Sequence, residues 1–386
     1  MTIRPDTPLI RCVPQLLGLY SARTEFGVLR RGVSSRIALR VATPYGERQS
    51  VQEKCVTTSY DVVAIGNAIV DILAPADDAF IVAEGMNKGS MQLVFSPEEA
   101  DALYAKMGPG QEVSGGSAAN TVAGIAALGG TCGFIGQVAD DQLGQVFAHD
   151  IKAAGVDFTT AARSGDPATA RCLIFVTPDG QRTMNTFLGA SQFLPAAALD
   201  RDMIRACKIL YLEGYLWDPE EPRAAMREAI DLARQSGKIV AFTLSDVFCI
   251  ARHGDDFRQL LADRLINILF ANEAELCALA RTDDLEAAIE QVAPQVNVLV
   301  VTRGEHGAYA ITGKVRFGVH AQPVASVVDT TGAGDLFAAG VLHGIAAGKA
   351  LDACLVQGAI CAAEVISHVG ARPQADLKAL VAAKLG

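Results

Sequence analysis

Residues 208–245 read KILYLEGYLWDPEEPRAAMREAIDLARQSGKIVAFTLS, and this stretch indicates the class of fold. Its first and last parts are short apolar runs, which are typical of strands buried on both faces. Between them, residues 220–237 place apolar side chains at the i, i+3, i+4 and i+7 spacing of an amphipathic helix. A helix between two buried strands predicts a parallel strand–helix–strand unit.

The same alternation extends from Tyr60 toward the C-terminus. Short apolar runs recur at residues 60–67, 131–139, 267–275 and 297–312. A helical pattern recurs at residues 283–293, and the chain after Asp335 is mostly helical in pattern. Together these segments predict an α/β fold of three layers, in which a central, mostly parallel sheet is covered by helices on both faces.

Two regions interrupt the alternation. Residues 72–113 and about 166–192 contain short strand-like pieces and turns, such as TPDGQRTMNTFLGAS at 177–191, and no full helix–strand unit. Insertions of this kind commonly form a small β-sheet over the site of an α/β domain, so we interpret them as a lid. Ordinary surface hairpins are the alternative.

Composition excludes several classes of function. The 386-residue chain is 50% hydrophobic, and its net charge of −10 argues against non-specific binding of nucleic acid. It has no run of about 18 uninterrupted apolar residues, so we expect no contact with a membrane. Its nine cysteines are odd in number and form no C-x-x-C pair, which indicates reduced thiols in a cytoplasmic protein.

Residues 1–58 differ from the rest of the chain. They hold nine basic against four acidic residues and no sustained helical or strand period. We interpret them either as a disordered extension or as a stretch upstream of a true start near Val56. The domain is therefore predicted to span residues 59–386.

Residues 327–345, VVDTTGAGDLFAAGVLHGI, carry the strongest chemical signal. Gly332, Ala333 and Gly334 allow backbone N–H groups to converge at the start of a helix, where the helix dipole attracts an anion. Asp335 then falls in the first turn. It is either a helix cap or a carboxylate placed to accept a proton from a hydroxyl that attacks a bound phosphoryl group.

Two common nucleotide motifs are absent from the sequence. None of its Gly-Lys pairs is followed by Ser or Thr, as a Walker A loop requires. Phe337 stands where a dinucleotide-binding fingerprint would have its third glycine. A Walker-type NTPase and a dehydrogenase are therefore disfavoured.

A second glycine-rich turn occurs in EVSGGSAANTVAGIAALGG, residues 112–130. Gly115 and Gly116 precede Ser117, a candidate N-cap, and Asn120 follows in the same first turn. The first strand is followed by GNAIVD, which predicts that Asn67 and Asp71 lie at its carboxyl end, where open α/β sheets bind ligands. An amide and a carboxylate are suited to hydrogen-bonding vicinal hydroxyls.

These motifs together resemble the ribokinase-like (PfkB-type) family of carbohydrate and nucleoside kinases. GGSAANTVAGIAALG and DTTGAGDLFAAG resemble the two signatures of the family, FANEAE resembles its N-x-x-E element, and VTRGEHGAY resembles its T-x-G-x-x-G nucleotide loop. The resemblance covers about residues 60–386. It implies a ribokinase-like fold with a small β lid.

The resemblance also implies roles for single residues. Asp335 would be the general base, with the backbone of Gly332, Ala333 and Gly334 as the anion hole. The phosphoryl acceptor would be bound by Asn67, Asp71, Gly115, Gly116, Ser117 and Asn120. The nucleotide would be bound by Asn272, Thr302, Gly304, Gly307 and the lid residue Arg182, which would reach the ATP phosphates. Asn272 and Glu275 would hold Mg²⁺ through water, and Asp329 and Thr331 lie where some members bind a monovalent cation such as K⁺.

Within the family, AIGNAIVDI and MNTFLGAS look most like adenosine kinases and the bacterial sugar kinases nearest to them. We therefore expect a cytoplasmic, monomeric or homodimeric enzyme that uses ATP and Mg²⁺ to phosphorylate a primary hydroxyl of adenosine or a similar nucleoside. A free sugar such as ribose or fructose is the alternative acceptor. A catalytically silent nucleoside- or nucleotide-binding regulator is a more distant alternative.

Overall fold

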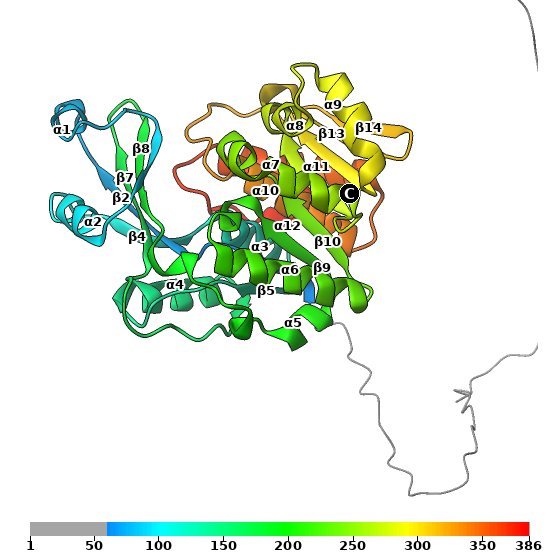
Figure 1. Ribbon diagram of the computed structural model, residues 1–386. Helices are drawn as coiled ribbons and strands as arrows, with labels where there is room; N and C mark the ends of the chain where they lie inside the picture. The colour runs from blue at the N-terminus through cyan, green and yellow to red at the C-terminus, as the bar shows by residue number, and fades with distance from the viewer. Residues whose placement is uncertain (1–59, 386) are drawn as a thin grey trace, which may run out of the picture. The chain divides into compact units, whose positions relative to one another are not determined.

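A computed structural model describes residues 60–385, so the predicted extension at residues 1–58 lies outside the described part of the chain. A nine-stranded sheet forms the centre of the fold, in the order β14-β13-β12-β11-β10-β9-β1-β5-β6 (Figure 1). Neighbouring strands from β12 to β6 are parallel, and β13 and β14 are added antiparallel. The strands are β1 (Tyr60–Ile65), β5 (Cys132–Ile135), β6 (Val156–Phe158), β9 (Cys207–Glu213), β10 (Ile239–Thr243), β11 (Ile268–Asn272), β12 (Val298–Thr302), β13 (Ala308–Thr312) and β14 (Val315–Val319).

Helices cover both faces of this sheet, because successive side chains of each buried strand point to opposite sides. Val62 and Ala64 of β1 belong to one hydrophobic core, and Val63 and Ile65 belong to the other. The first core includes α3 (Ser117–Ala127), α4 (Gln142–Ala153), α10 (Ala333–Ala346), α11 (Leu351–Val365) and α12 (Leu377–Leu385). The second includes α5 (Arg201–Ala206), α6 (Glu220–Gln235), α7 (Val247–Ala262), α8 (Glu273–Ala280) and α9 (Leu285–Val292). The predicted three-layer fold is confirmed.

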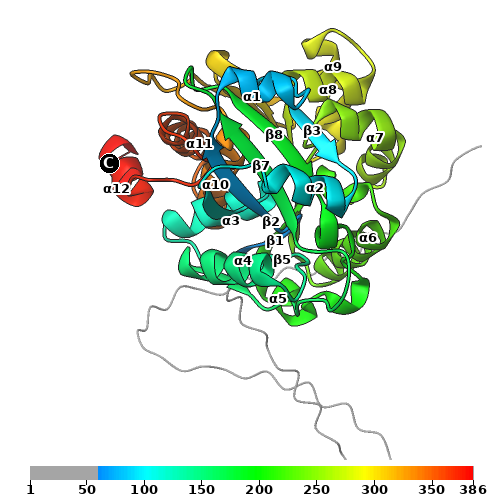
Figure 2. The same cartoon turned by 90° about the vertical axis from the view of Figure 1, so that its left-hand side faces the viewer.

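The two regions that interrupt the alternation meet in a second sheet of five strands, in the order β3-β8-β7-β2-β4 (Figure 2). Its strands are β2 (Ile69–Pro75), β3 (Met91–Val94), β4 (Gln111–Gly115), β7 (Ala170–Val176) and β8 (Arg182–Phe187). The small β-sheet expected from the sequence is therefore present, and its role as a lid stays a prediction.

Two short helices in this region were not predicted from the sequence. They are α1 (Asp78–Ala83) and α2 (Pro97–Tyr104). Each begins at a side-chain cap: Asp77 accepts the N–H of Phe80, and Ser96 accepts the N–H of Glu99. Phe80 of α1 contacts the ring of Phe175 in β7, and Asp101 of α2 pairs with Arg171 of the same strand, so both helices lie on one face of the second sheet.

None of the helices between residues 60 and 385 combines the length and the apolar character that crossing a bilayer requires. The seven cysteines of the same residues are free thiols, and six of them are buried. Cys12 and Cys55 lie outside the described residues.

Candidate functional site

A cavity of about 580 Å³ lies at the carboxyl edge of the large sheet. The ends of β9, β10, β11 and β12 contribute Glu213, Thr243, Asn272 and Thr302 to its wall. The helices α3 and α10 begin at the same edge and contribute Ser117 and Asp335, among others. This is the position at which open α/β sheets bind their ligands, and the volume suits a small molecule.

Asp335 is held between two side chains of α3. The hydroxyl of Ser117 donates to Asp335 Oδ1 at 2.6 Å, and Asn120 Nδ2 donates to Asp335 Oδ2 at 3.0 Å. The prediction that Ser117 caps α3 is wrong, because the N-cap is Gly116, with a φ of 99° and no side-chain cap. The Ser117 hydroxyl instead binds a carboxylate 218 positions away in the sequence.

The surroundings of Asp335 change its proton affinity. Burial raises the pKa of Asp335 above its ordinary value, and the hydrogen bonds from Ser117 and Asn120 and the charge of Arg372 partly offset this rise. A carboxylate with a raised pKa is a better proton acceptor than an exposed one.

Removing the Ser117 hydroxyl is expected to raise the pKa of Asp335 further, because that hydroxyl stabilises the ionised carboxylate. In Ser117→Ala, the acidic limb of the kcat/KM profile should move to higher pH by about one unit. Ser117→Thr keeps a hydroxyl and should restore the wild-type profile. An unshifted limb in Ser117→Ala would show that this hydrogen bond does not influence the titrating group.

The predicted anion hole lies at the start of α10. Gly332 is the N-cap, with a φ of 78° that favours glycine, and no side chain caps the helix. A Cβ on Gly332 would lie 2.7 Å from the Cβ of Ala371. The N–H of Ala333 donates to the carbonyl of Thr330, whereas within residues 60–385 the N–H groups of Gly332 and Gly334 have no backbone partner. Two of the three expected donors are therefore free to bind an anion.

The acceptor side of the cavity differs in part from the prediction. Asn67 follows β1 as expected, but its side chain is already engaged: Nδ2 donates to Glu213 Oε1 at 2.8 Å, and Oδ1 accepts from Ser191 at 2.8 Å. Asp71 does not lie at the end of the first strand, because the chain turns after Asn67 and Asp71 belongs to β2 of the second sheet. Asp71 therefore enters the cavity from the lid.

Asp71 also has a perturbed proton affinity. Burial raises its pKa to about 6, against the opposing charges of Arg182 and Arg372. The two glycines next to it have steric roles. A Cβ on Gly115 would lie 2.5 Å from Asp71 Oδ2, and a Cβ on Gly116 would lie 2.2 Å from the carbonyl oxygen of Asn67. Only glycine lets the end of β4 approach Asp71, and the N-cap of α3 approach Asn67, so closely.

Some of the residues expected to bind the nucleotide line the cavity, and others do not. Asn272 and Glu275 form a reciprocal capping box at the start of α8, and both line the cavity with Thr302. Burial raises the pKa of Glu275 to about 7. Gly304 and Gly307 lie in the turn between β12 and β13 and do not line this cavity.

Arg182 and Asp329 are brought together, although the sequence analysis gave them separate roles. Arg182 in β8 forms an ion pair with Asp329, and both side chains are almost fully buried. Neither residue lines the main cavity, whereas Thr331 does. The expected contact of Arg182 with ATP phosphates stays a prediction.

Two residues of the site were not predicted from the sequence. Glu213, at the end of β9, is fully buried, and its carboxylate accepts N–H groups of Asn67 and Ala118. Arg372, near the C-terminus, donates to the carbonyl oxygens of Ser114 and Ala119 and so holds the start of α3. No local motif marks either residue, because each acts on a segment that is distant in the sequence.

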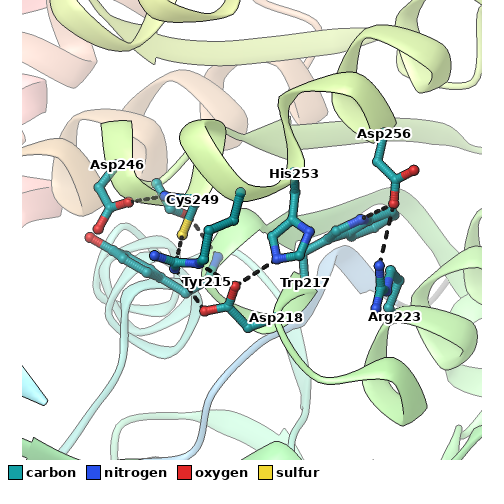
Figure 3. A network of polar contacts seen from close by, with 10 residues as sticks. Tyr215, Trp217, Asp218, Arg223, Asp246, Cys249, His253 and Asp256 are labelled. Atoms are coloured by element: carbon teal, nitrogen blue, oxygen red, sulfur yellow. Dashed lines mark hydrogen bonds and ion pairs between the residues drawn. The ribbon is translucent and has the colours of Figure 1, made fainter.

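A polar network fixes another wall of the cavity (Figure 3). Asp246 caps α7 by accepting the N–H of Cys249 at 2.6 Å. Asp218 accepts hydrogen bonds from Arg252 and from His253. Burial alone would raise the pKa of Asp218, but these partners lower it below its ordinary value. The network thus anchors the first turns of α7 to the loop after β9.

The face of the second sheet opposite helices α1 and α2 is mainly apolar and lines the cavity. Met91 and Leu93 on the edge strand β3 are 45% and 37% exposed there. The apolar side chains that this face and its flanking turn contribute to the cavity are Ile69, Met91, Leu93, Cys172, Ile174, Met184 and Leu188. The large sheet and its helices therefore contribute most of the polar side chains of the cavity, and the small sheet contributes a mainly apolar cover that also carries Asp71 and Thr186.

Comparisons with known proteins agree with this arrangement. Residues 89–377 match the model of the pfkB family of carbohydrate kinases. A fructokinase from Salmonella typhimurium is 31% identical to this chain over 284 residues, which cover 70% of this chain and 91% of the fructokinase.

Two solved structures are more similar. The adenosine kinase from Sinorhizobium meliloti is 46% identical, with a TM-score of 0.79, and the match covers 85% of this chain and 99% of that protein. A probable sugar kinase from Rhizobium etli is 43% identical, with the same TM-score and the same coverage. The relatives thus include kinases of both sugars and nucleosides.

Proposed function

Because the chain belongs to the pfkB family of carbohydrate kinases, we propose that it transfers the γ-phosphate of Mg·ATP to a primary hydroxyl of a nucleoside, with adenosine as the acceptor and AMP as the product. The chain is a sugar or nucleoside kinase by family. The choice of a nucleoside rests on one observation, the apolar face of the second sheet over the cavity.

This face favours an acceptor with an aromatic base. A free sugar carries hydroxyl groups on all sides, and burying a hydroxyl against apolar side chains without a hydrogen bond is unfavourable. A purine base offers apolar ring faces, which would cover the partly exposed Met91 and Leu93. The ribose would then lie toward the polar side chains at the edge of the large sheet and toward Asp71 of β2, whose carboxylate can accept hydrogen bonds from its hydroxyl groups.

The reaction would use groups already in place. The hydroxyl of the acceptor would pass its proton to Asp335, which Ser117 and Asn120 orient. The free N–H groups of Gly332 and Gly334 would stabilise the negative charge of the transferred phosphoryl group. Mg²⁺, which Asn272 and Glu275 would hold through water, would neutralise the charge of the ATP phosphates.

The acceptor is identified by an ADP-release assay with adenosine, inosine, ribose and fructose. We expect kcat/KM for adenosine to exceed that for ribose by about 10- to 100-fold, since burying the base contributes binding that ribose lacks. Faster turnover of ribose or fructose would show that the acceptor is a free sugar and not a nucleoside. ATP hydrolysis without any preference among acceptors would contradict the kinase reaction itself.

A pair of lid variants tests the observation that carries this proposal. Leu93→Ser places a hydroxyl in the apolar cover, so it should lower kcat/KM for adenosine and leave that for ribose almost unchanged. Phe95→Ser is the matched control, because Phe95 follows the same strand, is 83% exposed and does not line the cavity. Equal losses in both variants would show that the apolar cover does not select the acceptor.

A further inference from the structure

The carboxylate of Asp329 is a point at which three segments of the chain meet. Its Oδ1 accepts the N–H of Thr331 at 3.0 Å, and its Oδ2 accepts the N–H of Gly370 at 2.8 Å. Oδ2 also forms the ion pair with Arg182 of strand β8. The side chains of Asp329 and Arg182 are only 4% and 6% exposed, so water does not replace any of these contacts.

This arrangement does not fit the monovalent cation that the family resemblance implies at Asp329 and Thr331. A cation is bound by oxygen atoms with free lone pairs, and a carboxylate offers about four such sites. Three of these sites on Asp329 are already occupied, by two backbone N–H groups and a guanidinium, so only about one is left for a cation. Their positive ends would repel an ion that approached the same oxygens.

We propose that the guanidinium of Arg182 takes the place of that cation, so that a lid residue neutralises Asp329 and holds the loop that leads into the anion hole. Arg182 is thus a positioning residue for transfer of the phosphoryl group. The inference rests on the kinase reaction and not on the identity of the acceptor.

The geometry explains how a distant arginine can affect the reaction. Asp329 lies three residues before Gly332, the N-cap of α10, and fixes the intervening turn through the N–H of Thr331. A loop that shifts by about 1 Å moves the anion-hole N–H groups out of position, which can cost about 100-fold in rate. Because Arg182 lies two residues before Met184 of the cavity cover, the same ion pair also fixes the lid relative to this loop.

The first test uses the unmodified protein. Turnover is compared in potassium and in tetramethylammonium salts at equal ionic strength, with the acceptor that is phosphorylated fastest. We expect the same kcat in both salts, because the guanidinium of Arg182 supplies the positive charge beside Asp329. A wild-type enzyme that requires potassium would overturn the proposal.

The second test removes the internal cation. Arg182→Ala should lower kcat by about 10- to 100-fold with a smaller change in KM. Potassium or low concentrations of guanidinium should restore part of the loss, and Arg182→Lys should retain more activity than Arg182→Ala. In the double variant Arg182→Ala/Asp329→Asn, which has no charge to neutralise, these cations should have no effect. A loss in Arg182→Ala that no cation relieves would overturn the proposal.

Arg171→Ala is the matched control. Arg171 lies on the neighbouring lid strand β7 and is also buried and paired, but its partner is Asp101 of helix α2. Its loss should give no response to potassium. A cation response equal to that of Arg182→Ala would show that the effect is not specific to Asp329.

A measurement without turnover separates this proposal from the proposed function. The unfolding temperature of Arg182→Ala should rise in potassium chloride relative to tetramethylammonium chloride, and that of the wild type should not. This result would stand even if none of the four acceptors were phosphorylated. Equal unfolding temperatures of the variant in the two salts would contradict the proposal.

Discussion

The Asp335→Asn variant is expected to turn over at least about 100-fold more slowly than the wild type while it binds ATP with unchanged affinity. Asparagine keeps the shape of the side chain, and its amide oxygen can still accept the hydrogen bond of Asn120. The Ser117 hydroxyl can rotate to accept from the new amide nitrogen. The site should therefore stay assembled and lose only the group that accepts the proton.

The measurement is kcat under saturating ATP and acceptor, together with the Kd for ATP from equilibrium titration. The matched control is Asp352→Asn, because Asp352 is an exposed acid in the first turn of the next helix, α11. An aspartate that served only the helix dipole would contribute about 0.3–1 kcal/mol to stability in either helix. Turnover close to wild type in Asp335→Asn would show that Asp335 serves only the helix dipole and does not accept the proton.

The sequence was most informative where function depends on neighbouring residues. Gly332, Gly334 and Asp335 lie within one turn, so a motif was enough to place a carboxylate behind free N–H groups. The capping box of Asn272 and Glu275 is equally local. The α/β class was also predictable, because the alternation of buried strands with amphipathic helices repeats along the whole domain.

Contacts between distant segments could not be read in this way. Ser117 has the residue type and position of an N-cap, and only the approach of α10 shows that its hydroxyl serves Asp335. Asp71 follows the first strand by six residues, and the turn that carries it into the second sheet has no marked signal. The pairing of Arg182 with Asp329 joins residues 147 positions apart.

Glu213 is the site residue with the largest expected effect on folding. Its Oε1 accepts the backbone N–H and the side-chain amide of Asn67 at 2.7 and 2.8 Å, and its Oε2 accepts the N–H of Ala118 at 2.7 Å. Glu213→Ala leaves all three donors unpaired in a buried place. An unpaired buried donor costs about 1–3 kcal/mol, and water from the adjoining cavity would relieve part of this, so we expect the free energy of unfolding to fall by about 3–5 kcal/mol.

Glu213→Gln separates the hydrogen bonds from the charge. Its amide oxygen can still accept from Asn67, but its NH₂ group meets the N–H of Ala118. Urea denaturation should therefore show a smaller loss of unfolding free energy than in Glu213→Ala.

The pH dependence of the stability gives a second criterion. Burial raises the pKa of Glu213 to about 7 in the folded protein, whereas a glutamate in the unfolded chain has a pKa of about 4.3. Binding of the proton therefore stabilises the folded state. This contribution is complete below about pH 4.3 and is lost as the pH rises through about 7. Glutamine has no such proton, so the stability difference between wild type and Glu213→Gln should be larger at low pH than at high pH. A difference that is constant with pH would mean that Glu213 keeps its charge throughout, and that the three N–H groups outweigh the effect of burial on the carboxylate.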